Sequence, residues 1–230
     1  TITVIPGKLS KIIVEDAAGG SGSEVGLVEM TADASIVLYS IGYDSKGNFI
    51  RNVKTDWSRT GTLDNPSALD VSSIIFSPTT APTNGTIRAD TTGVIGDATG
   101  TINVRVGGLN QLAIRDNKGG EGEVVSDLYL TADESVNLYL SGYDKHMNYI
   151  KDVKGKWSVQ GSIGSVSTGD SFSASTVFNG SVVGVGKVVA DTSSFSTETG
   201  MITVTKGAFS YFKLVKNSGE NGKNFSDTTL

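Results

Sequence analysis

The sequence contains no cysteine among its 230 residues. Disulfide bonds, thiolate metal sites and a cysteine nucleophile are therefore excluded. Charge is also sparse, with 19 basic residues, 24 acidic residues and a net charge of −5. A mildly acidic chain without basic clusters argues against nucleic acid and against anionic membranes as partners.

Long apolar runs are missing as well. None approaches the ~20 residues of a membrane-spanning helix, so we expect no membrane insertion. Proline occurs only four times and no helix of ordinary length is visible, whereas glycine is frequent, with 29 residues. The length is comfortable for two domains. These features together favour a chain of strands and turns over a helical one.

One stretch occurs twice, at residues 35–57 (SIVLYSIGYDSKGNFIRNVKTDW) and at residues 135–157 (SVNLYLSGYDKHMNYIKDVKGKW). The alternation of side chains in each copy predicts two strands joined by a turn. Glycine and asparagine suit the left-handed positions of such a turn. The second copy has no glycine in its turn, so we expect Asn148 to take the positive φ angle there.

Comparison of the two copies predicts which face of each sheet points into a core. Leu38 and Leu138 stand on the face that is apolar in both copies, whereas the opposite face accepts polar residues in the second copy. This is the pattern of an antiparallel sheet with one solvated face. The next strand carries Trp57 or Trp157, whose indole we expect to fill the middle of a two-sheet core.

The register of the repeat predicts the domain boundaries. Residues 7–106 and 107–206 are two complete units, each opened by a glycine and closed by an apolar strand. Residues 1–6 match a closing strand, so we expect them to be the last strand of a preceding or partner unit. Residues 207–230 match the first strand or strands of a partial third unit. Almost no linker separates the units, which predicts a semi-rigid rod.

The number and order of the predicted strands indicate the fold class. Each unit is expected to hold about seven short strands in about 100 residues, with the tryptophan on the third strand. We therefore predict an all-β chain of tandem immunoglobulin-like β-sandwiches.

Several short motifs support this fold by resemblance. They are KIIVEDAAGG at 11–20, GYD at 42–44 and 142–144, TGTI at 99–102, LTAD at 130–133, and the two tryptophans. They resemble bacterial immunoglobulin-like repeats of large surface and extracellular proteins, such as invasin-like adhesins, surface-layer proteins and fibres. The resemblance covers nearly the whole chain. It implies an extracellular or cell-surface location and a scaffold or adhesion role, and it brings no shared catalytic motif.

Aspartates recur at matching positions of the two units. The pairs are Asp16 and Asp116, Asp33 and Asp133, Asp44 and Asp144, and Asp90 and Asp191. The first two pairs are candidate calcium ligands, because carboxylates near the joints of a rod suit this hard cation. The alternative is that aspartate caps turns by bonding to its own backbone. We favour the turns, because no dense Asp-x-Asp-x-Asp loop exists, and we expect no cofactor.

Other candidate sites also have simpler readings. His146, the only histidine, lies at a predicted turn tip, where a solvated residue is favoured over a catalytic or metal-binding one. Tyr43 and Tyr143 are expected on the outward face or at its margin. A sugar-stacking platform is the functional alternative there to cross-strand packing, which we favour. Glycosylation sequons begin at three asparagines. They are Asn84, Asn179 and Asn224.

We therefore expect a structural repeat module of an extracellular bacterial filament, surface layer or adhesin stalk, without catalysis. Its expected partners are copies of itself or neighbouring repeats. The fragment at 207–230 is too small to bury enough apolar area alone. Either the missing parts exist in a longer chain, or another copy completes them by strand complementation through the incomplete ends. One alternative is a module that binds carbohydrate or protein, such as a glycan or a host or cell-surface protein. Another is a pair of accessory domains of a secreted hydrolase.

Overall fold

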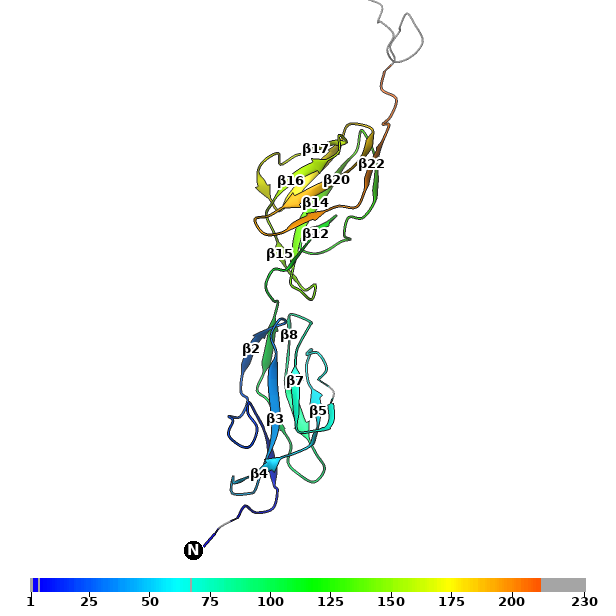
Figure 1. Ribbon diagram of the computed structural model, residues 1–230. Helices are drawn as coiled ribbons and strands as arrows, with labels where there is room; N and C mark the ends of the chain where they lie inside the picture. Colours follow the sequence, from blue (N-terminus) through cyan, green and yellow to red (C-terminus); the bar gives the residue numbers. More distant parts are fainter. Residues whose placement is uncertain (1, 4, 67, 212–230) are drawn as a thin grey trace, which may run out of the picture.

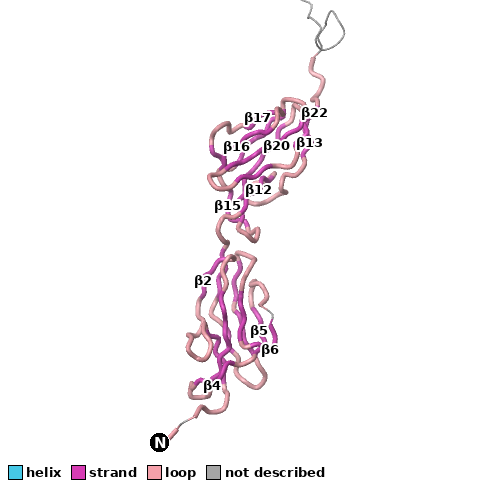
Figure 2. The backbone as a smooth tube through the Cα atoms, in the orientation of Figure 1, coloured by secondary structure: helices cyan, strands magenta, loops and turns pink. Residues whose placement is uncertain are grey.

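The computed structural model describes residues 2–3, 5–66 and 68–211, and this part of the chain contains strands and loops without any helix (Figure 2). Hence it also contains no helix that could cross a membrane. Two units lie end to end and give the molecule an elongated shape, with a narrow waist between them (Figure 1). The all-β fold predicted from the sequence is confirmed.

The two units contain similar, though not identical, successions of strands. In the first unit (unit 1) the strands are β1 (Lys11–Glu15), β2 (Val28–Thr31), β3 (Ile36–Tyr43), β4 (Phe49–Asn52), β5 (Thr55–Arg59), β6 (Ala68–Val71), β7 (Ser73–Phe76), β8 (Thr83–Gly85), β9 (Ile87–Asp90), β10 (Asp97–Ala98) and β11 (Ile102–Arg105). In the second unit (unit 2) they are β12 (Gln111–Arg115), β13 (Leu128–Thr131), β14 (Ser135–Tyr143), β15 (Tyr149–Asp152), β16 (Gly155–Gln160), β17 (Gly164–Val166), β18 (Phe172–Ser173), β19 (Ser175–Gly180), β20 (Gly184–Asp191), β21 (Ser196–Glu198) and β22 (Ile202–Thr205).

Each unit is built from two facing layers. In unit 1, β3 pairs with β1, β4 and β7 in one layer, and the other contains the ladders β10-β9-β5-β6 and β2-β11-β8. In unit 2 the layers are β12-β14-β19-β17 with β15 on β14, and β13-β22-β20-β16-β18 with β21 on β20. The units have more strands than the predicted seven because short pieces such as β10 and β18 pair at the sheet margins.

The start of each unit crosses from one layer to the other, which the sequence did not reveal. β1 pairs antiparallel with β3, and β2 then pairs parallel with the closing strand β11. In unit 2, β12 and β13 repeat this with β14 and β22. The glycine-rich loop between the two strands makes the crossing, and the parallel pairing holds the closing strand of each unit beside its beginning.

Each unit has its own apolar core between the layers. Trp57 and Leu38 lie in the first core and Trp157 and Leu138 in the second, all at most 3% exposed. Each indole Nε1 also donates a hydrogen bond to a backbone oxygen, at 3.1 Å for Trp57 and 2.9 Å for Trp157. The donor of each buried ring is thus satisfied, as a buried indole requires.

The outward face of the first layer is more covered than the alternation pattern predicted. Ile41 lies on that face of β3, yet it is fully buried. The glycine-rich loop folds over the neighbouring strand β4, where Gly20 approaches the ring of Phe49 so closely that an added Cβ would lie 2.6 Å from it. Gly20 also has a φ of 68°, which glycine adopts without strain. The loop therefore makes a small second packing region outside the main core.

Candidate functional site: the joint between the units

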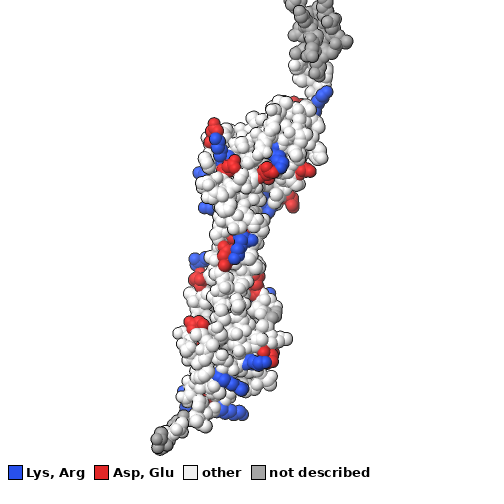
Figure 3. Space-filling view, viewed as in Figure 1, with Lys and Arg blue, Asp and Glu red and all other residues white. Residues whose placement is uncertain are grey.

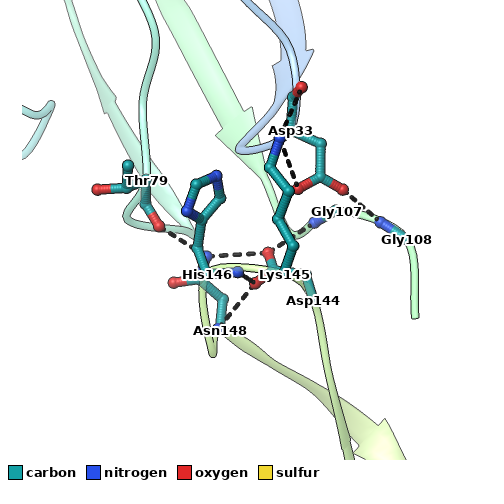
Figure 4. A network of polar contacts seen from close by, with 8 residues as sticks. All are labelled: Asp33, Thr79, Gly107, Gly108, Asp144, Lys145, His146 and Asn148. Carbon is teal, nitrogen blue, oxygen red and sulfur yellow. Dashed lines mark hydrogen bonds and ion pairs between the residues drawn. The ribbon is translucent and has the colours of Figure 1, made fainter. Parts of the chain in front are cut away.

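A buried carboxylate organises the turn with which unit 2 meets unit 1. Asp144 directly follows β14, and its side chain is fully buried. It accepts four hydrogen bonds, each of 2.9 Å, from Gly107 N, His146 N, Asn148 N and Asn148 Nδ2 (Figure 4). The bond from Gly107 ties the linker to the turn, and the other three shape the turn itself.

These bonds also set the charge state of the carboxylate. Burial alone would raise the pKa of Asp144. The bonds from Gly107, Asn148 and His146 outweigh burial and hold the pKa of Asp144 below its ordinary value. Asp144 is therefore ionised at neutral pH, and its charge strengthens each bond that it accepts.

Asn148 extends this network into unit 1. Its Oδ1 accepts a hydrogen bond from Ala81 N at 3.0 Å, and its Nδ2 donates one to Thr79 O at 2.8 Å. One side-chain amide thus binds a backbone donor and a backbone acceptor of the neighbouring unit while it remains bonded to Asp144. Figure 4 shows Asn148 between Thr79 and Asp144.

Unit 1 contributes a second carboxylate to the joint. Asp33 Oδ2 accepts a hydrogen bond from Gly108 N at 2.9 Å, and Lys145 Nζ lies 3.9 Å from Asp33 Oδ1. The ion pair is partly exposed and adds little by itself. An added Cβ on Gly107 would lie 2.0 Å from Asp33 Oδ2, so the linker fits against this side chain only as glycine. Figure 3 shows acidic and basic side chains meeting at the waist, on a surface that is otherwise mostly uncharged.

The joint is therefore held from both sides. Asp33 of unit 1 binds Gly108, Asp144 of unit 2 binds the preceding residue, and Asn148 bridges the two units. His146 lies in the turn, as the sequence predicted, and is half-buried there, lining a small gap of about 230 Å³ in the joint. Both linker amides are thus bonded, and the amide bridge of Asn148 connects the units beside them.

The two turns of the repeat share one backbone conformation. The positive φ angle falls on Met147 (66°), at the position of Gly47 (84°), and not on Asn148 as expected. Asn148 instead follows this residue, where its amide reaches both Asp144 and unit 1. The shared signal in the sequence was an aspartate followed four residues later by an asparagine, and its role at the joint was missed.

The four calcium candidates each bind a backbone amide. Asp16 and Asp116 accept from Ser23 N and Glu123 N, both at 2.8 Å, and so close their own loops. Asp33 and Asp133 accept from the residues that leave each unit, Gly108 N at 2.9 Å and Ala208 N at 2.7 Å. Within the described residues no three His, Asp or Glu side chains gather as a metal site. The geometry of these carboxylates is that of turns and joints.

The aromatic candidates Tyr43 and Tyr143 pack against neighbouring side chains. Tyr143 is only 3% exposed although it lies on the outward face, because Tyr149 packs edge-on at 5.9 Å and the guanidinium of Arg115 lies 5.4 Å from the ring centre. Tyr43 is half-buried and donates its hydroxyl proton to Glu15. Burial and this partner raise the pKa of Tyr43 to about 12. Both rings are packing residues of the outward face.

The remaining candidates lie away from the joint or outside the described part. Asn84 and Asn179 are exposed on β8 and β19. Asn224 and the strand expected from residue 212 onward lie outside the described residues. In the segment at 1–6, the described residues are exposed and form no strand in this chain.

Comparison with known proteins gives structural neighbours only. No family model and no curated protein matches the sequence. The Escherichia coli adhesin FdeC has 17% identity over 93% of this chain and 71% of its own, with a TM-score of 0.39. Domains 4 and 5 of the surface-layer protein SbsC have 14% identity over 86% of this chain and 99% of theirs, with a TM-score of 0.30. The Yersinia pseudotuberculosis adhesin InvE has 14% identity over 84% of this chain and 58% of its own, with a TM-score of 0.32. These neighbours are of the kind that the resemblance in the sequence predicted.

Proposed function

We propose that the chain is a structural repeat module that serves as a stiff spacer in an extracellular bacterial filament, surface layer or adhesin stalk. The observation that carries the proposal is the joint, where both linker amides and one bridging asparagine are fixed by hydrogen bonds. A chain that only displayed independent binding domains would gain nothing from such a clamp. A chain that holds something at a distance needs one. The proposal includes no catalysis.

The surface of the units suits an extended spacer. Charges are scattered on the visible face, and the sandwiches meet only at their ends (Figures 1 and 3). The burial of Tyr143 favours the spacer over the sugar-stacking alternative. A glycan array probed with the full chain checks this directly, and binding that Tyr43→Ala abolishes would favour an adhesion module over a spacer.

Imaging tests the spacer function. Single chains observed by electron microscopy should appear as straight rods of one length, and Asn148→Ala should produce bent particles at the waist. Asn52→Ala, in the turn-distal end of β4, serves as a control that leaves the joint intact. Freely bent wild-type particles would contradict the proposal.

Strand complementation is the finer part of the proposal. Ile2 is 94% exposed, whereas Ile102 and Ile202, at the same position of the repeat, are fully buried in the two cores. Residues 1–6 have the composition of a closing strand, and such a strand can add to an open sheet edge of another unit. We expect the chain to associate at high concentration and Ile2→Asp to prevent it. A chain that sediments as a monomer at every concentration would contradict complementation and leave the spacer function untouched.

A further inference from the structure

Unit 2 contacts unit 1 through the turn at residues 144–148. Unit 1 has an equivalent turn at the end where the chain enters it. We call residues 44–48 the proximal turn. Asp44 accepts hydrogen bonds from Gly7 N at 2.8 Å and from Lys46 N, Asn48 N and Asn48 Nδ2 at 2.9 Å each. These bonds, with that from Asn48 Nδ2 foremost, hold the pKa of Asp44 well below its ordinary value. The four partners occupy the same repeat positions as the four partners of Asp144.

The two turns differ in the contacts that their asparagine makes outside its own turn. Asn148 is half-buried because its Oδ1 and one amide hydrogen bind Ala81 and Thr79. Asn48 has the same bonds to its aspartate but is exposed, and its Oδ1 has no partner among the residues that the structure describes. The proximal turn is thus preformed for a joint whose other half is absent from the described residues.

The segment ahead of the proximal turn points to the missing half. Ile2 stands where Ile102 fills the core of unit 1 and Ile202 fills that of unit 2. In the central joint, the unit that is closed by such a strand also supplies the loop that Asn148 binds. The partner of Asn48 should therefore be the unit that uses residues 1–6 as its closing strand.

The C-terminal end of unit 2 in a second chain cannot be the partner of the proximal turn. There Asp133 already holds Ala208 N at 2.7 Å, and an added Cβ on Gly207 would lie 1.9 Å from Asp133. Gly207 and Gly7 both occupy the repeat position of Gly107, and a joint accommodates one linker glycine at this position. Unit 2 of one chain, with its own linker bound to Asp133, is therefore blocked from docking on the proximal turn of another chain.

We propose that the proximal turn is a docking surface for an immunoglobulin-like unit that is closed by residues 1–6. The loop of that unit at the position of residues 79–81 donates a backbone N–H to Asn48 Oδ1 and accepts a hydrogen bond from Asn48 Nδ2. Ser45 stands at the position of Lys145, so the ion pair of the central joint has no counterpart here, and the exposed Lys46 occupies the position of His146. This inference rests on the proposed spacer function, because it extends the same joint to the other end of the chain.

The test adds a second copy of residues 7–100 ahead of residue 1 of the full chain, so that residues 1–6 become its closing strand. The absence of native cysteine allows specific spin labelling. Cysteines replace the exposed Ser58 in both copies of unit 1, and the distribution of distances between the labels is measured by pulsed electron paramagnetic resonance. A second sample carries labels at Ser58 of the inner copy and Ser158, across the existing joint.

We expect a narrow distribution across the new joint, which Asn48→Ala in the inner copy broadens to the width that Asn148→Ala produces across the existing joint. The matched control is Asn48→Ala in the outer copy, whose turn faces solvent, and it should change nothing. A new joint that is broad before any substitution, or that Asn48→Ala in the inner copy does not alter, overturns the inference. If the existing joint is itself broad, the spacer function fails instead.

Discussion

Replacement of Trp157 by phenylalanine tests whether the two units are separate cooperative blocks. Trp157 is 1% exposed, and its Nε1 donates to Ser173 O at 2.9 Å. Phenylalanine removes this bond, which contributes about 1 kcal/mol. It also removes buried apolar surface equivalent to roughly two methylene groups, at about 0.8 kcal/mol each. With the cavity that remains, we expect unit 2 to lose about 2–4 kcal/mol of unfolding free energy.

The assay uses the fact that the chain has only two tryptophans. In the Trp157→Phe variant, fluorescence reports on Trp57 and hence on unit 1, while hydrogen exchange followed by mass spectrometry reports on both units. For a domain of this size the unfolding free energy falls by about 1–3 kcal/mol per molar urea. The urea concentration at which half of unit 2 is unfolded should therefore fall by about 1–2 M. The midpoint of unit 1 should barely move, because the units share few contacts.

The mirror variant Trp57→Phe serves as the control. It should lower the midpoint of unit 1 and leave Trp157 to report an unchanged unit 2. In the Trp157→Phe variant, Trp57 fluorescence gives the urea midpoint of unit 1 and hydrogen exchange gives that of unit 2. If both midpoints fall together, the units unfold as one block. The description of two separate cores in series would then be wrong.

Three further predictions concern the joint and the outward face. Gly107→Ala would place a carbon 2.0 Å from Asp33 Oδ2, so the carboxylate must release the linker. The distribution of spin-label distances across the joint should then broaden, while the urea unfolding midpoints of both units stay unchanged. Burial and Glu15 raise the pKa of Tyr43 to about 12, so an alkaline absorbance titration should show a late ionisation that Tyr43→Phe removes. The pKa of Asp144 is depressed in the folded chain, so its stabilisation is complete above the unfolded value of about 3.9 and is lost only as pH falls through the lower folded value. The amide resonance of Gly107 should therefore keep its position through pH 4 and shift only in stronger acid.

The repeat made most of the fold predictable from the sequence. Leu38 and Leu138 identified the core face because the second copy tolerates polar residues only on the other face, and a large indole in each copy needed a two-sheet core. The crossing of the first strand between layers could not be predicted, because the glycine-rich loop shows where the chain bends but not which sheet it joins afterwards.

The joint was less accessible from the sequence, for a physical reason. Asp144 and Asn148 could be assigned to a turn from their spacing, since such side chains bond to nearby backbone. The second use of Asn148, toward Thr79 and Ala81, depends on how two units are placed, and periodicity within one unit carries no such information. The burial of Tyr143 on the outward face was missed for a similar reason, because its cover comes from Arg115 and from a neighbouring strand.

The central claim is that the joint holds the two units in one orientation. The most direct test labels Ser58→Cys and Ser158→Cys in the full chain, both exposed and on equivalent strands, and measures the distribution of distances between the two spin labels in solution. The hydrogen bonds of Asp33, Asp144 and Asn148 predict one narrow peak at neutral pH. A broad, continuous distribution in the unmodified joint would contradict the account.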